Sequence, residues 1–168
     1  PAPVTIFAAT VSKAAVITVF LRLFPPPIIE NDRFLFILFA ALSVASMSVG
    51  NLLALRQQSV KRMLAYSTIA HNGYLLVAFL SGSTLARTAV LLYLFFTVIT
   101  NLASFGIVSL LSGDASEADD QDGYTGLAWR RPGIALVLSA ALLSLLGIPL
   151  TAGFIAKFAL VAAGMASK

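Results

Sequence analysis

Three ionisable side chains lie inside long apolar stretches of this sequence: Lys13, His71 and Lys157. A lysine at the centre of a membrane helix costs about 2.5–3.5 kcal/mol on insertion scales. A soluble core also excludes lysine unless the charge is paired. Ionisable residues kept in such places are candidates for function, and amines and imidazoles can both bind and release protons. The chemistry that these three residues predict is proton transfer.

Lys13 lies in "AATVSKAAVITV", midway along an apolar segment expected from Val4 to Leu23. About 15 Å of helix separates it from either end, so its ammonium does not readily reach an interface. We predict a protonatable group that faces a hydrated interior. The alternative is a lysine that only bonds the carbonyls of a neighbouring helix.

The last apolar segment, Ile134 to Ala166, is too long for one span. Its 33 residues would form a helix of about 50 Å, against a hydrocarbon core of about 30 Å. Within it, "GIPLTAG" contains Pro149, which removes a backbone donor, and two glycines, which permit a bend. We therefore predict a discontinuous helix, broken at Gly147–Gly153.

Lys157 follows this break by one helical turn, in "GFIAKFAL". Non-helical backbone at membrane depth is tolerated only inside protein or along a wet cavity, and transporters place ion sites at such breaks. We predict that Lys157 carries protons there. The alternative is a structural tie to the carbonyls of the broken helix.

His71 lies in "AYSTIAHNGYLL". Helical spacing places Ser67, His71 and Tyr74 on one face, with Thr68 and Asn72 on the adjoining stripe. A histidine in a polar stripe suits a proton relay. The alternative is an interhelical hydrogen bond, worth about 1 kcal/mol.

Asn101 has Thr97 one turn before it and Ser104 nearly one turn after it. These residues could extend the polar path, but helix packing is the favoured interpretation. Small residues of the second apolar segment are interpreted in the same way: Ala41, Ala45, Ser46 and Gly50.

Composition places these residues in a membrane protein. Of the 168 residues, 59% are hydrophobic and 11% are charged, whereas soluble domains carry about 25% charged residues. The fold class predicted is all-α, a polytopic transmembrane helix bundle that forms one domain over residues 1–168. About five spans are expected: Val4–Leu23, Phe34–Leu55, Met63–Leu80, Leu85–Leu111 and the broken Ile134–Ala166.

Charges between the spans predict the topology. One side carries Arg56, Lys61, Arg62, Arg130 and Arg131, and the other carries Arg22, Arg33, Arg87 and Lys168. The adjacent Lys61 and Arg62 favour the first side as cytoplasmic. The acidic stretch "SGDASEADDQDGYTG" is interpreted as a solvated connection without chemistry.

Several function classes are excluded. The net charge of +4 is not concentrated on an aromatic-rich face, so we expect no nucleic acid partner. The chain has no cysteine and one histidine, which excludes Cys-ligated iron–sulfur clusters and a bis-His haem. We expect no metal and no cofactor in this chain. The opening "PAPVTIF" is not typical of a signal peptide and suggests the middle of a longer chain.

Three stretches resemble one known family: "PAPVTIFAATVSKAAVITVFLRLF", "KRMLAYSTIAHNGYLLVAFL" and "LLSLLGIPLTAGFIAKFAL". They are similar to the antiporter-like membrane subunits of respiratory complex I, and "YTGLAWRRPGIALVLSAALLSLLGIPLTAGFIAKF" favours the N-type branch over the L and M types. The resemblance covers essentially the whole chain. It implies a bundle of about fourteen helices with two inverted repeats, of which the chain matches about the eighth to twelfth helices.

The resemblance also implies roles for the three titratable residues. Lys13 matches the family's central-axis lysine, and Lys157 matches the lysine of the broken twelfth helix, the terminal proton carrier. His71 matches the histidine of the pattern that Lys61 and Arg62 begin. The family's glutamate on the fifth helix and lysine on the broken seventh helix have no counterpart in this sequence.

The expected function is proton translocation as part of an NADH:quinone oxidoreductase, an enzyme whose flavin and iron–sulfur clusters lie in partner subunits. Partners implied are the other membrane subunits of complex I in a hetero-oligomer, the lipid bilayer and protons. The expected location is the bacterial inner membrane, or the mitochondrial inner membrane in a eukaryote. Two alternatives are a subunit of a cation/proton antiporter or membrane-bound hydrogenase, and a structural membrane fragment that translocates nothing.

Overall fold

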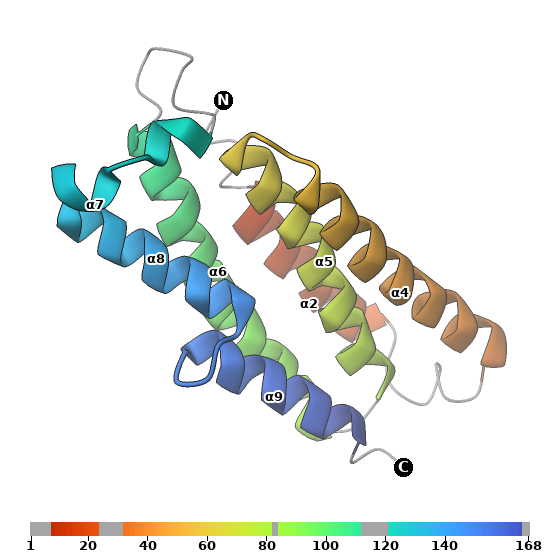
Figure 1. Ribbon diagram of the computed structural model, residues 1–168. Coiled ribbons are helices and arrows are strands. Elements are labelled where there is room, and N and C mark those ends of the chain that lie inside the picture. Colours follow the sequence, from red (N-terminus) through yellow and green to blue (C-terminus); the bar gives the residue numbers. More distant parts are fainter. Residues whose placement is uncertain (1–7, 24–31, 82–83, 112–120, 166–168) are drawn as a thin grey trace.

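The computed structural model describes residues 8–23, 32–81, 84–111 and 121–165 (Figure 1). Within these ranges the chain is helical and forms no strand, as the sequence predicts. The elements in chain order are η1 (Ala8–Ser12), α2 (Lys13–Leu23), α4 (Arg33–Leu55), α5 (Val60–Leu80), α6 (Thr84–Leu111), η3 (Gln121–Tyr124), α7 (Leu127–Arg130), α8 (Pro132–Leu146) and α9 (Ala152–Met165).

In the described part of the chain, three helices are long and apolar enough to cross a membrane: α4, α5 and α6. They correspond to the second, third and fourth predicted spans. Helix α5 begins three residues earlier than expected because Ser59 caps it, its hydroxyl accepting a hydrogen bond from the Arg62 amide at 3.4 Å. Asp32 caps α4 in the same way, through the Phe34 amide at 3.0 Å.

The fifth predicted span is two helices, which confirms the discontinuity. Helix α8 has 15 residues and α9 has 14, and residues 147–151 separate them. The break ends at Thr151, whereas we expected it to extend to Gly153. Gly153 is already helical, because its conformational freedom is not needed there and its small size serves the packing of α9 on α8 instead.

The first span contains a feature that the sequence did not predict. Residues 8–12 form a π-helical turn, η1, and Lys13 is the first residue of the α-helix that follows. Short π-helical segments within α-helices occur frequently at functional sites. Residues 4–7 of this predicted span lie outside the described residues, as do the acidic residues 114–120, the prolines of residues 25–27 and Lys168.

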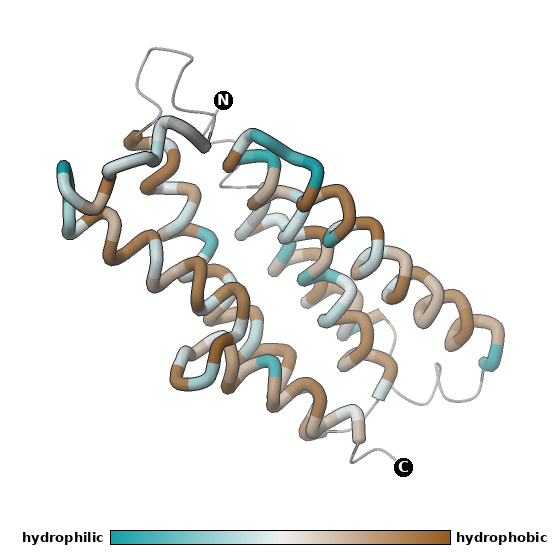
Figure 2. The backbone as a smooth tube through the Cα atoms, in the orientation of Figure 1, coloured by the Kyte–Doolittle hydropathy of each residue, from teal (hydrophilic) through white to brown (hydrophobic). Residues whose placement is uncertain are grey.

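Helix α6 is central to the bundle: it packs against α2 with η1, α5, α8 and α9 (Figure 1). Two apolar clusters line it, one shared with α5 and α9 and the other with α5 and α8. Helix α4 packs on α5. The outward sides of the helices remain apolar, as Figure 2 shows along α4, and this is the surface expected of helices that face lipid or further membrane helices.

Glycines set the close approach of α4 and α5. A side chain at Gly50 would overlap the Ala70 backbone, and one at Gly73 would overlap Met47 and the Ser43 carbonyl. The Ser43 hydroxyl donates a 2.7 Å hydrogen bond to the Gly73 carbonyl. The predicted packing role of Gly50 is therefore confirmed.

Two other small residues of α4 do not share this role. Ala41 and Ala45 are exposed within the described part of the chain, since they lie on the side of α4 that faces away from α5, and Ser46 is half-buried. Their predicted helix-packing role is therefore not seen within the described residues and stays a prediction.

The basic connections collect at one end of the bundle. Figure 1 shows the α4–α5 connection, with Arg56 and Lys61, at the same end as α7, which carries Arg130. The starts of α4 and α6, with Arg33 and Arg87, lie at the opposite end. This is the grouping that the sequence predicted for the two sides.

Candidate proton-transfer site

Lys13 is buried, with 8% of its surface exposed, directly after the π-helical turn. Its Nζ has no hydrogen-bond partner within the described residues. The carbonyl contacts that a purely structural lysine would make are therefore not formed in this part of the chain. The ammonium is left for water or for groups beyond the described residues.

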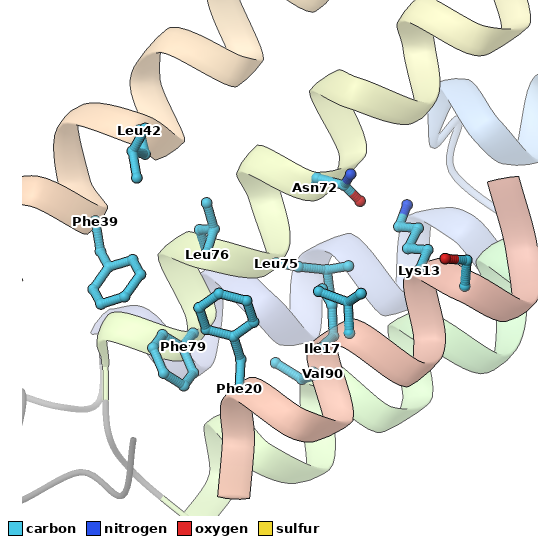
Figure 3. A pocket seen from close by; sticks show the side chains of 12 residues that line it. Lys13, Ile17, Phe20, Phe39, Leu42, Asn72, Leu75, Leu76, Phe79 and Val90 are labelled. Carbon is cyan, nitrogen blue, oxygen red and sulfur yellow. The ribbon is translucent and has the colours of Figure 1, made fainter. Parts of the chain in front are cut away.

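A pocket of about 380 Å³ opens beside Lys13, between α2, α4 and α5. Figure 3 shows that its far end is aromatic, where Phe20, Phe39 and Phe79 pack edge to face at centroid distances of 5.7–6.3 Å. Its polar end is formed by Lys13 and Asn72, whose side chains point toward one another. The pocket thus has the volume for several waters near the lysine.

His71 lies on α5 within the bundle and is 6% exposed. Its ring lies between two tyrosines, with centroids 6.0 Å from Tyr74 and 6.0 Å from Tyr93. Its Nδ1 is buried without a hydrogen-bond partner among the described residues. Both Lys13 and Lys157 lie within electrostatic range of the imidazole, so the structure brings the three predicted residues into one region.

The hydroxyls predicted to flank His71 bond to their own helix. Ser67 and Thr68 each donate to the Leu64 carbonyl at 2.8 Å. On α6, Thr97 donates to the Tyr93 carbonyl at 2.7 Å and Ser104 donates to the Thr100 carbonyl at 2.8 Å.

Asn101 differs from these hydroxyls in its hydrogen bonding. It is 2% exposed, and its Nδ2 has no partner within the described ranges. The favoured packing interpretation of this residue agrees with its burial in α6, away from the pockets that the lysines line.

Lys157 contacts the end of α8. Its Nζ donates to the carbonyls of Leu145 at 2.6 Å and Leu146 at 3.1 Å. The carbonyls of Leu143 and Ser144, two residues earlier, are bonded by the amides that follow the helix, as in a Schellman motif with Gly147 left-handed at φ 80°. Lys157 therefore satisfies the carbonyls that this motif leaves free, at the negative end of the helix dipole.

These contacts are the ones predicted by the alternative in which Lys157 only binds the carbonyls of the broken helix. Lys157 also faces the candidate proton-transfer site. Its Nζ lies 5.4 Å from the centroid of the Tyr74 ring. With His71 and Tyr74 it lines a pocket of about 360 Å³ between α4, α5, α8 and α9. A second space of about 10 Å³, at the lower limit of what can hold one water, is lined by His71, Tyr93 and Lys157.

The break itself contains a strained residue. The Thr151 amide donates to the Ile148 carbonyl at 3.1 Å, so Pro149 and Leu150 are the central residues of a β-turn. Leu150 has φ 81°, in the left-handed region that type II turns normally fill with glycine. Its side chain is fully exposed, with no packing in the described residues to offset this strain.

Gly153 allows α9 to return onto α8 directly after the break. A Cβ at this position would collide with the carbonyl oxygen of Ser144. The Gly153 amide also donates to the Ser144 hydroxyl at 3.1 Å. This close approach fixes the start of α9, and with it the position of Lys157 one turn later.

Sequence reasoning missed Tyr93 as a residue of this site. It lies on α6, is 2% exposed and contacts the His71 ring. The available signal was a tyrosine within an apolar helix, which was counted with the other apolar residues. Only the packing of α6 on α5 reveals that it faces the imidazole.

The fold and this site together define a class: a polytopic helical membrane protein with titratable side chains buried beside a discontinuous helix. All 168 residues match the family described as NADH:quinone oxidoreductase/Mrp antiporter, TM, and the chain belongs to this family. This confirms the resemblance stated from the sequence motifs.

Curated relatives include NADH-quinone oxidoreductase subunit N from three bacteria. That of Methylococcus capsulatus is 47% identical, that of Chromohalobacter salexigens 50% and that of Ectopseudomonas mendocina 48%. Each similarity covers 98% of this chain and 34–35% of the relative. The chain thus spans about a third of the length of these relatives.

Proposed function

We propose that this chain forms part of a proton-translocating membrane subunit of an NADH:quinone oxidoreductase, with Lys13, His71 and Lys157 as its proton-transfer groups. The observation that carries the proposal is that the buried His71 of α5 lies within electrostatic range of both the buried Lys13 of α2 and the half-buried Lys157 of α9. The names of the relatives support the enzyme assignment.

In the proposed relay, protons would pass between Lys13 and Lys157 by way of His71. Lys13 lines one pocket, Lys157 lines another, and His71 on α5 lies within electrostatic range of both lysines. Waters in these pockets would complete the hydrogen-bonded path between the side chains. Driving one proton against 100 mV costs about 2.3 kcal/mol, so the path needs groups that change their proton affinity during turnover.

The other parts of this proposal concern the whole protein. The chain would be embedded in the bacterial inner membrane, or in its mitochondrial counterpart, in a hetero-oligomer with the other membrane subunits. Flavin and iron–sulfur clusters would lie in partner subunits, and this chain would contribute no cofactor.

Lys157 provides the test, because its structural and functional roles respond differently to substitution. In the complete complex, Lys157→Met keeps the length of the side chain but removes the titratable group. Lys157→Arg keeps the charge and the donors for the Leu145 and Leu146 carbonyls, but hardly ever releases a proton.

If Lys157 carries protons, both variants should lose most NADH-driven pumping in membrane vesicles while the complex stays assembled. We expect about a tenfold or greater loss, equivalent to about 1.4 kcal/mol or more on the transfer barrier. If arginine restores full pumping and methionine disrupts assembly, Lys157 is only a cap for α8 and the carrier role is wrong.

A second candidate function is a subunit of a cation/proton antiporter, since the matched family also includes Mrp antiporters. Purification of the chain with flavin and iron–sulfur subunits supports the oxidoreductase. Purification without them, together with sodium-dependent proton exchange in vesicles, supports the antiporter.

A further inference from the structure

Two complementary polar atoms at the end of the Lys13 pocket lack hydrogen-bond partners within the described residues. They are Lys13 Nζ, a donor when protonated, and Asn72 Oδ1, an acceptor. Both atoms are buried, so bulk solvent does not satisfy them. Buried polar groups are almost always satisfied by protein or by ordered water. The pair therefore points to a ligand that both side chains share.

The geometry favours water as that ligand. Figure 3 shows the two side chains directed toward one another across the same pocket, Lys13 from α2 and Asn72 from α5. They do not hydrogen-bond to each other directly. The pocket of about 380 Å³ is many times the volume of one water, about 30 Å³. A single water can accept from the ammonium and donate to the carboxamide oxygen.

We propose that Asn72 is the positioning residue for Lys13 and that it acts through a water held between Nζ and Oδ1. The inference rests on the proposed function, because it assigns Asn72 to the same proton path. Asn72 directly follows His71 on α5. The bridge would therefore tie the lysine of α2 to the helix that carries the imidazole.

The chemistry of a carboxamide suits this place. It offers an acceptor to the charged ammonium and a donor to the neutral amine, so it can hold the water in both states of the lysine. It carries no charge, so it does not trap the proton as a carboxylate would. No carboxylate of the described residues acts on Lys13, and the charged groups around the site are His71 on α5 and Lys157 on α9.

The test uses two substitutions of Asn72 in the complete complex. Asn72→Leu keeps the approximate size but removes both polar groups. It should lower NADH-driven proton pumping roughly 2- to 10-fold, the effect of losing one hydrogen bond. Asn72→Asp places a negative charge beside the ammonium, which then holds its proton to higher pH. Pumping should fall, and the alkaline limb of its pH profile should move to higher pH.

A matched control removes a buried carboxamide elsewhere. Asn101→Leu on α6 changes a residue that lines neither lysine pocket, so it should alter stability but leave the pH profile in place. If Asn72 had only a structural role, Asn72→Asp would alter stability and leave the pH profile in place, as Asn101→Leu does. Should Asn72→Leu fail to assemble, Asn72→Ser keeps a small polar group and should restore assembly with reduced pumping.

Failure of this inference is distinguishable from failure of the proposed function. Wild-type pumping and an unshifted pH profile in both Asn72 variants would overturn the inference, while loss of pumping in both Lys157 variants, with the complex assembled, would leave the function standing. Full pumping in Lys157→Arg would instead remove the function on which the inference rests.

Discussion

Tyr74 contacts two of the three titratable residues. Its ring lies 5.4 Å from the Lys157 ammonium and 6.0 Å from the His71 ring. A cation over an aromatic face gains about 0.5–2 kcal/mol, more where water is excluded. The Tyr74 ring and the α8 carbonyls both stabilise the charged form of Lys157. Helical spacing in the sequence placed Tyr74 beside His71, but it did not indicate that Tyr74 contacts Lys157, which lies 83 residues later.

Substitutions of Tyr74 separate its ring from its hydroxyl. Tyr74→Phe keeps the aromatic face, so proton pumping by the complex should stay near the wild-type rate. Tyr74→Leu removes the face and should slow pumping about 2- to 10-fold, in line with the cation–π energy. The measurement is NADH-driven acidification of membrane vesicles, normalised to assembled complex. Equal impairment of both variants would show that the hydroxyl, rather than the ring, is what the site requires.

The broken helix is the element that positions Lys157. Gly147 ends α8 in a left-handed conformation, the strained turn at Leu150 reverses the chain locally, and Gly153 lets α9 approach the Ser144 carbonyl. Lys157 then returns to bond the last carbonyls of α8. Around the break, the amides of Gly147, Ile148, Thr151 and Gly153 all donate hydrogen bonds, and irregular backbone at membrane depth needs such partners.

Glycine substitutions test this element. Gly153→Ala forces a methyl group against the Ser144 carbonyl and should destabilise the complex by about 1–3 kcal/mol, as overpacking does. The expected result is less assembled complex on native gels and a lower melting temperature. Gly106→Ala on α6 is the control, because a Cβ there meets nothing within 4 Å. Equal stability of the two variants would contradict the close packing of α9 on α8.

At the scale of the whole molecule, the distribution of charge predicts orientation. Basic residues of the α4–α5 connection and of α7 lie at one end of the bundle, and the adjacent Lys61 and Arg62 favour that end as cytoplasmic. The α8–α9 break lies part of the way along the bundle axis (Figure 1).

These 168 residues contain no cysteine, so cysteines introduced here can report the orientation of the chain. A single cysteine at Gln58, in the exposed connection between α4 and α5, should react with a membrane-impermeant maleimide only from the cytoplasmic side. A cysteine at Leu85, exposed at the start of α6, should react only from the other side. The reverse pattern would invert the predicted topology, and labelling of both from one side would contradict the helix arrangement.

Much of the architecture followed from the sequence by itself. Long apolar segments predicted the spans α4, α5 and α6 because a bilayer excludes charge over the length of a span. The excessive length of the last segment, together with Pro149, predicted a break because one helix could not fit the membrane. Lys13, His71 and Lys157 were identified by the cost of burying an ionisable group. These conclusions depend on local composition and length, which a single sequence contains.

Other features depended on contacts between segments far apart in the chain, and only the tertiary structure decided them. Tyr93 faces His71 because α6 packs on α5, and Asn72 faces Lys13 because α2 places the lysine across the same pocket. The π-helical turn before Lys13 and the left-handed Leu150 have no local sequence signal, since neither residue type favours those conformations. Such features are selected by packing energy summed over several helices, and helical periodicity within one segment does not contain that information.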